Sequence, residues 1–414
     1  MPIRIVLKDF LMSKFRLAHL GLVMAAIGFT AATPVIGLGS LAYAADTVRA
    51  EVGKPLQEAQ KLASSGKNKE ALAKLREADS VGGKTAFESY QIERVRASAA
   101  AGAGDTATAI KAFEAVINSG RLSAAEAPKF TQGLAGMYYR AKDWPNAITW
   151  FNRSLKDKED PQTRDYLIQA YYSSGNYAAA AKELQSRGGN SEGSLQMLAN
   201  IQLKQNDKAG YVATLEKLAA NYPKTSYWAD LLNRVSGKPG FSQRLGLDVQ
   251  RLRLANGLFT KPSEYMEISQ LALQAGNPGE ALKIIDQGYK KGILGVGADA
   301  ARHQRLKDLA LKTQADLKAS AAKSEAEYVK NKDADSLSKL GFALVHDGQT
   351  DKGLDLMNQA VKLGTAKYPE EAQLHLGIAY GVAGKKANAQ SALKAVKGTD
   401  GAADLARYWS LMLK

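Results

Sequence analysis

The 414-residue chain contains no cysteine. This absence excludes disulfide bonds, thiolate metal ligands, cysteine nucleophiles and lipid attachment through an N-terminal cysteine. It is compatible with an oxidising compartment without proving one. Prolines are also few, at 11, while 45% of the residues are apolar and 23% are charged. This composition is typical of a folded, helix-rich protein.

Catalytic and metal-binding signatures are scarce as well. The chain has four histidines, and His303, His346 and His375 each stand alone, without the H-x-x-x-H spacing of a metal site. We therefore expect these three histidines to lie at the surface or in a groove. No G-x-S-x-G sequence and no pair of catalytic carboxylates is recognisable. We predict no enzyme activity, no metal and no cofactor.

Two glycine motifs resemble nucleotide-binding sequences but lack their context. Gly83-Lys84-Thr85 looks like the end of a phosphate-binding loop, yet the first glycine of that loop would fall at Ala78 and no strand precedes it. The sequence Gly295-x-Gly297 echoes the dinucleotide fingerprint, which requires a preceding buried strand. We interpret neither motif as a nucleotide site.

The first 44 residues have the order of a secretory signal. Lys14 and Arg16 precede an apolar stretch from Leu17 to Leu41, and Ala42-Tyr43-Ala44 follows as an A-x-A cleavage site. We predict cleavage after Ala44 and export to the periplasm, with Met12 as the preferred start and no membrane span after cleavage. The alternative is an uncleaved signal that anchors the chain in the inner membrane.

The chain is basic, with a net charge of +15 at pH 7. The predicted signal carries four basic residues and one acidic residue, so its removal lowers the net charge to +12. Such a charge attracts anionic lipids, polysaccharides, peptidoglycan or nucleic acid over a long range. A solvated, lysine-rich helical surface explains the same charge without any anionic partner.

A pattern returns every thirty-odd residues along the chain. A small residue, an aromatic residue or leucine, a glycine turn and then an alanine follow one another in residues 166–184, 340–360 and 376–396. Such a period indicates helical units that bury their apolar faces against one another in an elongated array. In two neighbouring copies the same positions recur 33 residues apart: Tyr138 and Tyr171, Trp144 and Tyr177, Ala147 and Ala180.

This pattern resembles the tetratricopeptide repeat (TPR), a unit of helix A, turn and helix B, over most of the chain beyond residue 50. The resemblance implies an all-α, right-handed solenoid of about eight helix-turn-helix repeats, some degenerate, with a C-terminal capping helix. Gly341 and Gly377 stand where helix A must approach helix B closely. The expected segments are a signal (1–44), an N-terminal TPR-like array (45–223), a degenerate helical pair (224–261), a TPR-like repeat (262–297), a long charged helical segment (298–333), a C-terminal TPR pair (334–397) and the capping helix (398–414).

Three places depart from the repeat. The fifth unit has Asn206-Asp207 where the turn glycine is expected, and Tyr211 where the alanine is expected. Residues 245–252 alternate in part between apolar and polar, so a strand competes there with the helix that we favour. Residues 298–330 contain neither glycine nor proline and predict one long helix or two stacked ones.

The concave groove of TPR proteins is lined mainly by a few positions of each helix A. Carried onto this chain, the resemblance implies a polar, basic strip with tyrosines, which suit partner binding because they combine contact area with hydrogen bonding. The paired Lys and Asn of the family's clamp for chaperone carboxylates are not recognisable. The candidate groove residues are Arg94, Lys129, Tyr139, Arg140, Gln169, Tyr172, Asn200 and Lys204, with Gln132, Gln162 and Asp165 beside them.

Repeat solenoids of this kind bind partners and seldom catalyse reactions. We therefore expect a non-catalytic periplasmic scaffold that binds an envelope protein or assembly through its concave surface, with no nucleic acid partner. The alternative is an anionic envelope polymer, such as exported polysaccharide or peptidoglycan, stacked on Tyr139 and Tyr172. Strong loss of binding with added salt would favour the polymer.

Overall fold

The computed structural model describes residues 47–413, so the predicted signal and its cleavage site lie outside the described residues. Every regular element within 47–413 is helical, with twenty α-helices and one short 3-10 helix. This result confirms the all-α repeat architecture. None of these helices combines the length and the apolarity that crossing a membrane requires.

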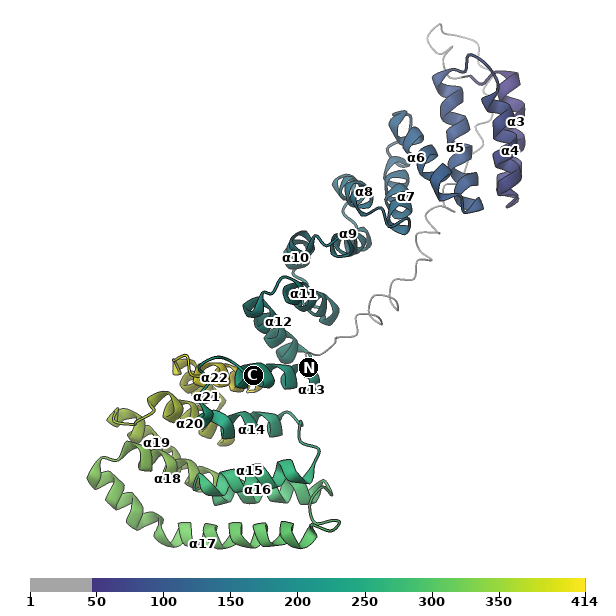
Figure 1. Cartoon of the computed structure of the whole chain (residues 1–414). Coiled ribbons are helices and arrows are strands. Elements are labelled where there is room, and N and C mark those ends of the chain that lie inside the picture. The colour runs from purple at the N-terminus through teal and green to yellow at the C-terminus, as the bar shows by residue number, and fades with distance from the viewer. Residues whose placement is uncertain (1–46, 414) are drawn as a thin grey trace. The chain divides into compact units, whose positions relative to one another are not determined.

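The described chain forms two compact units, which meet in sequence between Asn206 and Asp207. The N-terminal unit is a row of antiparallel helix pairs in which each pair packs on the next (Figure 1). Its helices are α3 (Ala50–Ser64), α4 (Asn68–Asp79), α5 (Ala86–Ala103), α6 (Thr106–Asn118), α7 (Ala127–Arg140), α8 (Trp144–Asp157), α9 (Pro161–Ser173), α10 (Tyr177–Ser186) and α11 (Glu192–Lys204).

The C-terminal unit contains the remaining helices, including the longest one. Within the segment 298–333, residues 300–331 form a single helix, and residues 245–252 are helical and not a strand. The elements are α12 (Lys208–Asn221), α13 (Thr225–Ser236), η1 (Gln243–Leu245), α14 (Gly246–Ala255), α15 (Pro262–Gln274), α16 (Pro278–Lys290), α17 (Ala300–Asn331), α18 (Ala334–His346), α19 (Thr350–Leu363), α20 (Pro369–Val382), α21 (Lys386–Ala395) and α22 (Ala402–Met412).

One left-handed residue makes the turn between the two helices of a pair. Gly104 and Gly175 adopt it with φ values of 78° and 80°, and Lys142 and Asn206 adopt it with 59° and 56°. Asn206 therefore replaces the turn glycine of the fifth unit, as its sequence predicts, since Asn tolerates this conformation. The next residue caps the second helix by accepting a hydrogen bond from a backbone N–H of its first turn, and the caps are Asp105, Asp143, Asn176 and Asp207.

The two helices of a pair cross closely where glycine is present. A Cβ atom at Gly341 would lie 2.5 Å from the carbonyl oxygen of Gly353, and one at Gly377 would lie 2.6 Å from the Leu393 side chain. Both distances are far below a van der Waals contact. The predicted close approach of helix A and helix B at these two glycines is thereby confirmed.

Successive pairs are joined by a recurring hydrogen bond. The hydroxyl of Tyr138, on the first helix of its pair, donates to Glu114, on the second helix of the preceding pair, at 2.6 Å. At the equivalent place in two other pairs the tyrosine accepts: the Asn152 amide donates to the Tyr171 hydroxyl at 3.1 Å, and the Asn358 amide donates to the Tyr380 hydroxyl at 2.9 Å. Because these tyrosines bond inside the stack, they fix the register of one pair on the next.

In the C-terminal unit the last helix returns to the first ones. Helix α22 packs on α20 and α21, as expected of a capping helix, and also on α12 and α14. Tyr408 meets Trp228 edge to face with ring centroids 6.4 Å apart, and Arg407 pairs with Glu216 at 2.8 Å. The helices of this unit therefore form a closed ring, and α14 contributes to its inner side.

Candidate functional site

The predicted groove residues lie on α5, α7, α9 and α11, the first helices of successive pairs. The turn residues Lys142, Gly175 and Asn206 define the register, with spacings of 33 and 31 residues. Counted back from these turns, the following groups occupy equivalent positions: Tyr139, Tyr172 and Leu203; Arg140, Ser173 and Lys204; Gly136, Gln169 and Asn200.

The two groove tyrosines are half-buried and pack on aromatic neighbours. The Tyr139 ring lies edge-on to Trp144 and Tyr166, with centroid distances of 5.3 and 5.5 Å. Burial raises the pKa of Tyr139 to about 12. Tyr172 makes the equivalent contact with Tyr177 at 5.5 Å. Both rings therefore support the helix pair, and only a part of each is available to a partner.

Arg94 is held by contacts within the N-terminal unit. Its guanidinium pairs with Glu126 at 2.7 Å and lies over the rings of Tyr90 and Phe130, 5.6 and 6.0 Å from their centroids. Gln132 makes a comparable link, since its amide donates to the Thr163 hydroxyl at 2.7 Å. These two predicted groove residues tie each first helix to the start of the next one.

Lys129, Arg140 and Lys204 are exposed, and no ion pair is recorded for them in the described chain. Gln169 differs from them, because its amide oxygen is buried and accepts no hydrogen bond from the residues described, while its nitrogen donates to Ser173 at 3.3 Å. Asn200, at the equivalent position of α11, is partly exposed. Amide groups on consecutive first helices can bond a chain that lies across them.

Leu203 was missed by sequence reasoning, although it belongs to this strip. Its side chain is 37% exposed at the position that Tyr139 and Tyr172 occupy on the two preceding first helices. The spacing that reveals it is 31 residues, not the 33 of the preceding pair. These residues form what we call the N-terminal strip. Tyr139, Tyr172 and Leu203 offer apolar contacts along one line, and Gln169 and Asn200 offer amides along another. Arg140 and Lys204 add cations.

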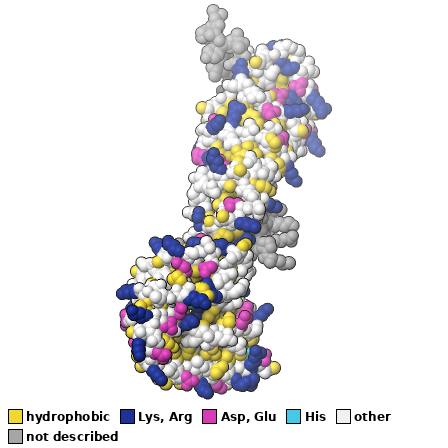
Figure 2. Space-filling view, turned by 60° about the vertical axis from the view of Figure 1, so that its left-hand side comes forward, with side chains coloured by type: hydrophobic (Ala, Val, Ile, Leu, Met, Phe, Trp, Pro, Cys, Tyr) yellow, Lys and Arg dark blue, Asp and Glu magenta, His cyan; other side chains and the backbone are white. Residues whose placement is uncertain are grey.

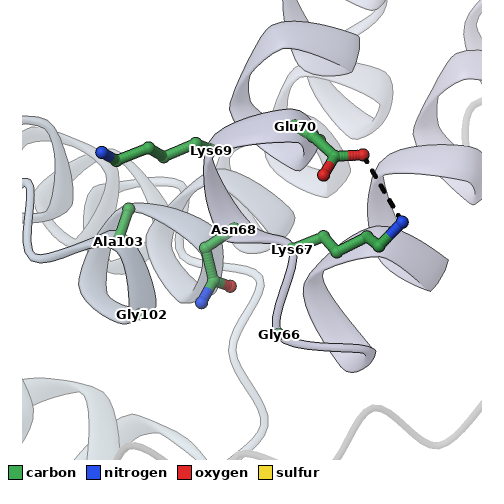
Figure 3. Close-up of a pocket in the computed structure, with 7 residues that line it drawn as sticks. All are labelled: Gly66, Lys67, Asn68, Lys69, Glu70, Gly102 and Ala103. Carbon is green, nitrogen blue, oxygen red and sulfur yellow. Dashed lines mark ion pairs between the residues drawn. The ribbon is translucent and has the colours of Figure 1, made fainter.

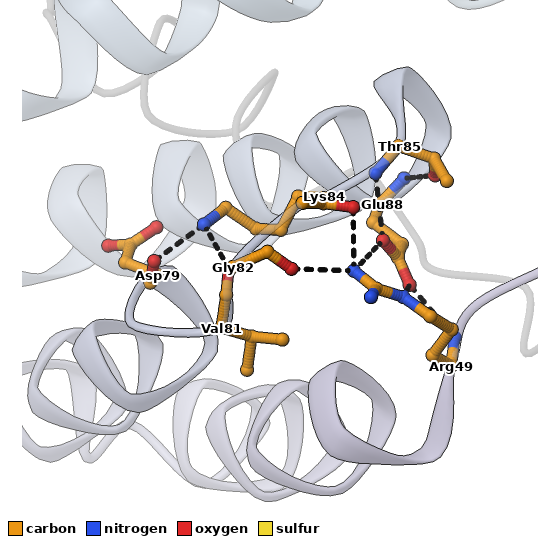
Figure 4. A network of polar contacts seen from close by, with 8 residues as sticks. Arg49, Asp79, Val81, Gly82, Lys84, Thr85 and Glu88 are labelled. Carbon is orange, nitrogen blue, oxygen red and sulfur yellow. Dashed lines mark hydrogen bonds and ion pairs between the residues drawn. The ribbon is translucent and has the colours of Figure 1, made fainter.

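The sequence Gly83-Lys84-Thr85 has a structural role. The Lys84 ammonium donates to the backbone oxygens of Asp79 and Val81, at 2.5 and 2.8 Å (Figure 4). Thr85 caps α5 in a capping box with Glu88. The hydrogen bonds of Arg49 to Glu88, at 2.9 Å, lower the pKa of this carboxyl to about 2. These residues fasten the start of α3 to α5 and leave no phosphate loop.

An open hollow of about 330 Å³ lies at the opposite ends of α3 and α5, between the start of α4 and the end of α5 (Figure 3). The ion pair of Lys67 with Glu70, at 3.8 Å, crosses its rim. Gly102 forms part of its floor, and a Cβ atom there would clash with Asn68 at 2.4 Å. Its lining is a helix start with exposed lysines, without a buried polar group, so we assign it no function.

The family model for the tetratricopeptide repeat matches residues 194–225. This match falls on α11 and α12, and a left-handed turn residue like Asn206 recurs between the helices of the other pairs, for example at Gly104, Gly175 and Gly348. The chain therefore contains a tetratricopeptide repeat. Among curated proteins, none matches its sequence.

Several solved structures are similar to this chain at low sequence identity. A complex of Naa15 and Naa10 bound to HypK-THB is 14% identical, covers 83% of this chain and has a TM-score of 0.35. This chain spans 57% of the length of that one. The TPR domain of P58(IPK) is 13% identical, with coverages of 88% and 98% and a TM-score of 0.22. The pentatricopeptide repeat protein PPR10 from maize is 16% identical. The match covers 86% of this chain and 61% of that one, with a TM-score of 0.29.

The histidine prediction for this TPR protein is wrong in two of three cases. His303 and His346 are buried, with 3% and 8% of their surface exposed. His303 accepts a hydrogen bond from the Gly295 backbone at 3.1 Å, and the His346 ring packs on Phe342 with centroids 4.7 Å apart. His375 keeps 21% of its side-chain surface exposed, and its Nε2 lies 3.0 Å from an Asp248 oxygen. Asp248 and His375 are 127 residues apart in sequence, so no local pattern announces their contact.

Asp248 and His375 belong to a buried ionic cluster on the inner side of the C-terminal ring. Arg251 donates to both oxygens of Glu280 at 2.7 Å and to Asp248 at 2.7 Å, and its guanidinium lies 4.9 Å from the Phe342 ring centroid. Burial alone would raise the pKa of Asp248, yet His375 and Arg251 lower it to about 2. One cation thus connects α14 with α16 and α18.

This cluster is suited to holding the ring together. Its cation and carboxylates satisfy one another, so no charged group is poised for catalysis. No three residues among the His, Cys, Asp and Glu of the described chain are arranged to hold a metal ion. The inner side of the C-terminal unit is thus occupied by its own side chains, and the N-terminal strip is the stronger candidate for partner binding.

Proposed function

We propose that this TPR protein is an exported, non-catalytic scaffold that holds an extended segment of an envelope protein along α7, α9 and α11. A TPR fold is that of a protein-interaction scaffold, and this part of the proposal rests on the repeats themselves. The periplasmic location is supported by the signal-like order of residues 1–44.

The observation that carries the proposal is the buried amide oxygen of Gln169, which lacks a donor in the described chain. A buried acceptor without a donor costs about 1–3 kcal/mol, so rotation of this half-buried side chain toward a ligand that supplies an N–H relieves this cost. An extended peptide offers backbone N–H groups at regular intervals. Asn200 would meet the same peptide one helix pair further on, and Leu203 would meet its side chains.

The alternative ligand, an anionic polymer, has less support. Stacking of a sugar needs an open ring face, whereas Tyr139 is held among Trp144, Phe151 and Tyr166. Figure 2 shows Lys and Arg side chains scattered among acidic ones on the face that it displays. A polymer would favour a continuous basic track. A peptide with acidic groups near Arg140 and Lys204 needs only local charge.

Photo-crosslinking in cells tests the groove. A photoreactive amino acid replaces Asn200 in one variant and Lys182, an exposed residue of the second helix α10, in a control variant. We expect a discrete protein adduct at position 200 that is lost when Arg140→Glu and Lys204→Glu are added. Equal adducts at both positions, or an adduct at 182 alone, would remove the groove from consideration.

A further inference from the structure

Helix α17 is packed on one side only. Of its 32 residues, His303, Leu306, Ala310 and Ala321 are buried, and its neighbours are α15, α16 and α18. It runs along the outer edge of the C-terminal unit (Figure 1). The inner side of this unit is filled by the ionic cluster, whereas the outer side of α17 is a free surface 32 residues long.

An apolar strip follows the outer side of α17. Leu311, Ala315, Ala322 and Val329 are all exposed and are separated by 4, 7 and 7 residues. These spacings return to the same side of a helix, because 18 residues complete five turns, and they span about 27 Å. Leu311 is 48% exposed and Val329 is 47% exposed. The small alanines between them allow another helix to approach closely.

A row of basic side chains runs beside this strip. Arg305, Lys312, Lys323 and Lys330 follow one another at 7, 11 and 7 residues, which also keeps them on one line of the helix. The structure records no ion pair for any of the four, although Asp316 and Glu327 lie on the same side of α17.

Basic residues on the inner edges of α17 behave differently. Lys307 pairs with Asp286 at 2.8 Å and Lys318 pairs with Asp347 at 3.3 Å. The inner lysines therefore serve the packing of the ring, whereas the outer basic row has no acidic partner on a neighbouring helix.

We propose that the outer side of α17 docks an amphipathic helix of a partner protein that carries acidic residues along one edge. The apolar strip would receive the apolar side of that helix, and the outer basic row would pair with its acidic edge. A second copy of α17 in antiparallel pairing is disfavoured, because it would bring the two basic rows together. This surface is separate from the N-terminal groove, so the protein would connect two partners.

The test uses the full chain and two synthetic amphipathic helices of roughly 20 residues, about as long as the strip. Both have leucine and alanine on one side, and one edge carries glutamates in the first peptide and lysines in the second. We expect the acidic peptide to bind about tenfold more tightly than the basic one, as charge complementarity predicts. Fluorescence anisotropy measures both affinities.

Variants locate the bound peptide. Lys312→Glu with Lys323→Glu, and separately Leu311→Gln, should each weaken the acidic peptide by about tenfold. The control is Lys54→Glu with Lys61→Glu, two exposed lysines of α3 that give the same change in charge, and it should bind like the unaltered chain. Circular dichroism verifies that each variant is folded.

Several outcomes overturn the proposal. Equal binding of the two peptides, or equal loss in the α3 control, would show that general charge and not this surface is responsible. Sedimentation that shows a dimer broken by Leu311→Gln would assign the strip to a second copy of the chain. Binding of phosphatidylglycerol vesicles that the α17 variants abolish, without binding of the acidic peptide, would assign it to a lipid surface.

Discussion

At the scale of single residues, Arg251 links three helices of the C-terminal unit. It is 6% exposed and links carboxylates of α14 and α16. A buried cation is tolerated only when its charge and its N–H groups are paired, and here two carboxylates and an aromatic face do so. Removal of this one side chain leaves two buried carboxylates, Asp248 and Glu280, without their shared cation.

We therefore expect Arg251→Met to lower the free energy of unfolding by about 3–5 kcal/mol, the usual cost of an uncompensated buried charge. Urea unfolding followed by circular dichroism measures this loss. The control is Arg253→Met on the same helix, whose half-exposed guanidinium meets Asn233 at 3.2 Å. Its effect should stay below about 1 kcal/mol. Equal losses in the two variants would contradict the role of the cluster.

The positions of single residues could be predicted from the sequence where they depend on local spacing, but not where they depend on long-range contacts. The family register located Arg140, Gln169, Asn200 and Lys204 on the first helices, because it depends on local spacing alone. The ring contacts of Tyr139 depend in part on Tyr166, on another helix pair, so its packing role could not be read from its own repeat. A contact between residues 127 positions apart, such as His375 with Asp248, leaves no local pattern.

At the scale of elements, turn and crossing residues determine each helix pair. The absence of glycine and proline in 298–330 correctly predicted a helix, while its continuity as one helix depends on packing against α15, α16 and α18. In residues 245–252 the alternation of apolar and polar residues favoured a strand, while the spacing of the apolar residues favoured a helix. These residues are helical, and Val249 and Leu252 are buried on one side of α14.

Gly341 tests the crossing. A Cβ atom there meets the backbone oxygen of Gly353, which cannot move aside as a flexible side chain can. Gly341→Ala should therefore lower the free energy of unfolding by about 1–3 kcal/mol. Thermal melts compare it with Gly246→Ala, where φ is −57° and no atom lies within 4 Å of the added Cβ. That control should be neutral or slightly stabilising, by up to about 1 kcal/mol. A melting point that is unchanged in the Gly341 variant would contradict the close crossing.

At the scale of the whole molecule, the two units differ in how they end. The N-terminal unit is an open row of pairs, whereas the C-terminal unit closes because α22 returns to α12 and α14. Closure depends on pairs such as Arg407 with Glu216 and Lys238 with Asp404, which are 191 and 166 residues apart. The sequence predicted a capping helix, but the second surface that it covers depends on how the helices between α12 and α22 stack.

The burial of His346 also makes the stability of the C-terminal unit sensitive to acid. This side chain is 8% exposed, and neither ring nitrogen has a hydrogen-bond partner among the described residues. Burial lowers the pKa of His346 to about 4, against 6.5 for the unfolded chain, although Glu280 opposes the shift. Between these two values the unfolded state binds a proton that the folded state does not, so stability falls as the pH falls from 6.5 to 4.

The fall should approach about 1.4 kcal/mol for each pH unit within that window. Urea unfolding of the unaltered chain and of His346→Gln, at several pH values from about 7 down to about 4.5, measures it. The variant removes the titrating group, so its stability should depend less steeply on pH in this range. Asp248 and Glu280, whose pKa values are lowered, lose their contributions only at lower pH, which separates their effect from that of His346. If the two chains lose stability in parallel, the acid sensitivity arises from another group of the ring.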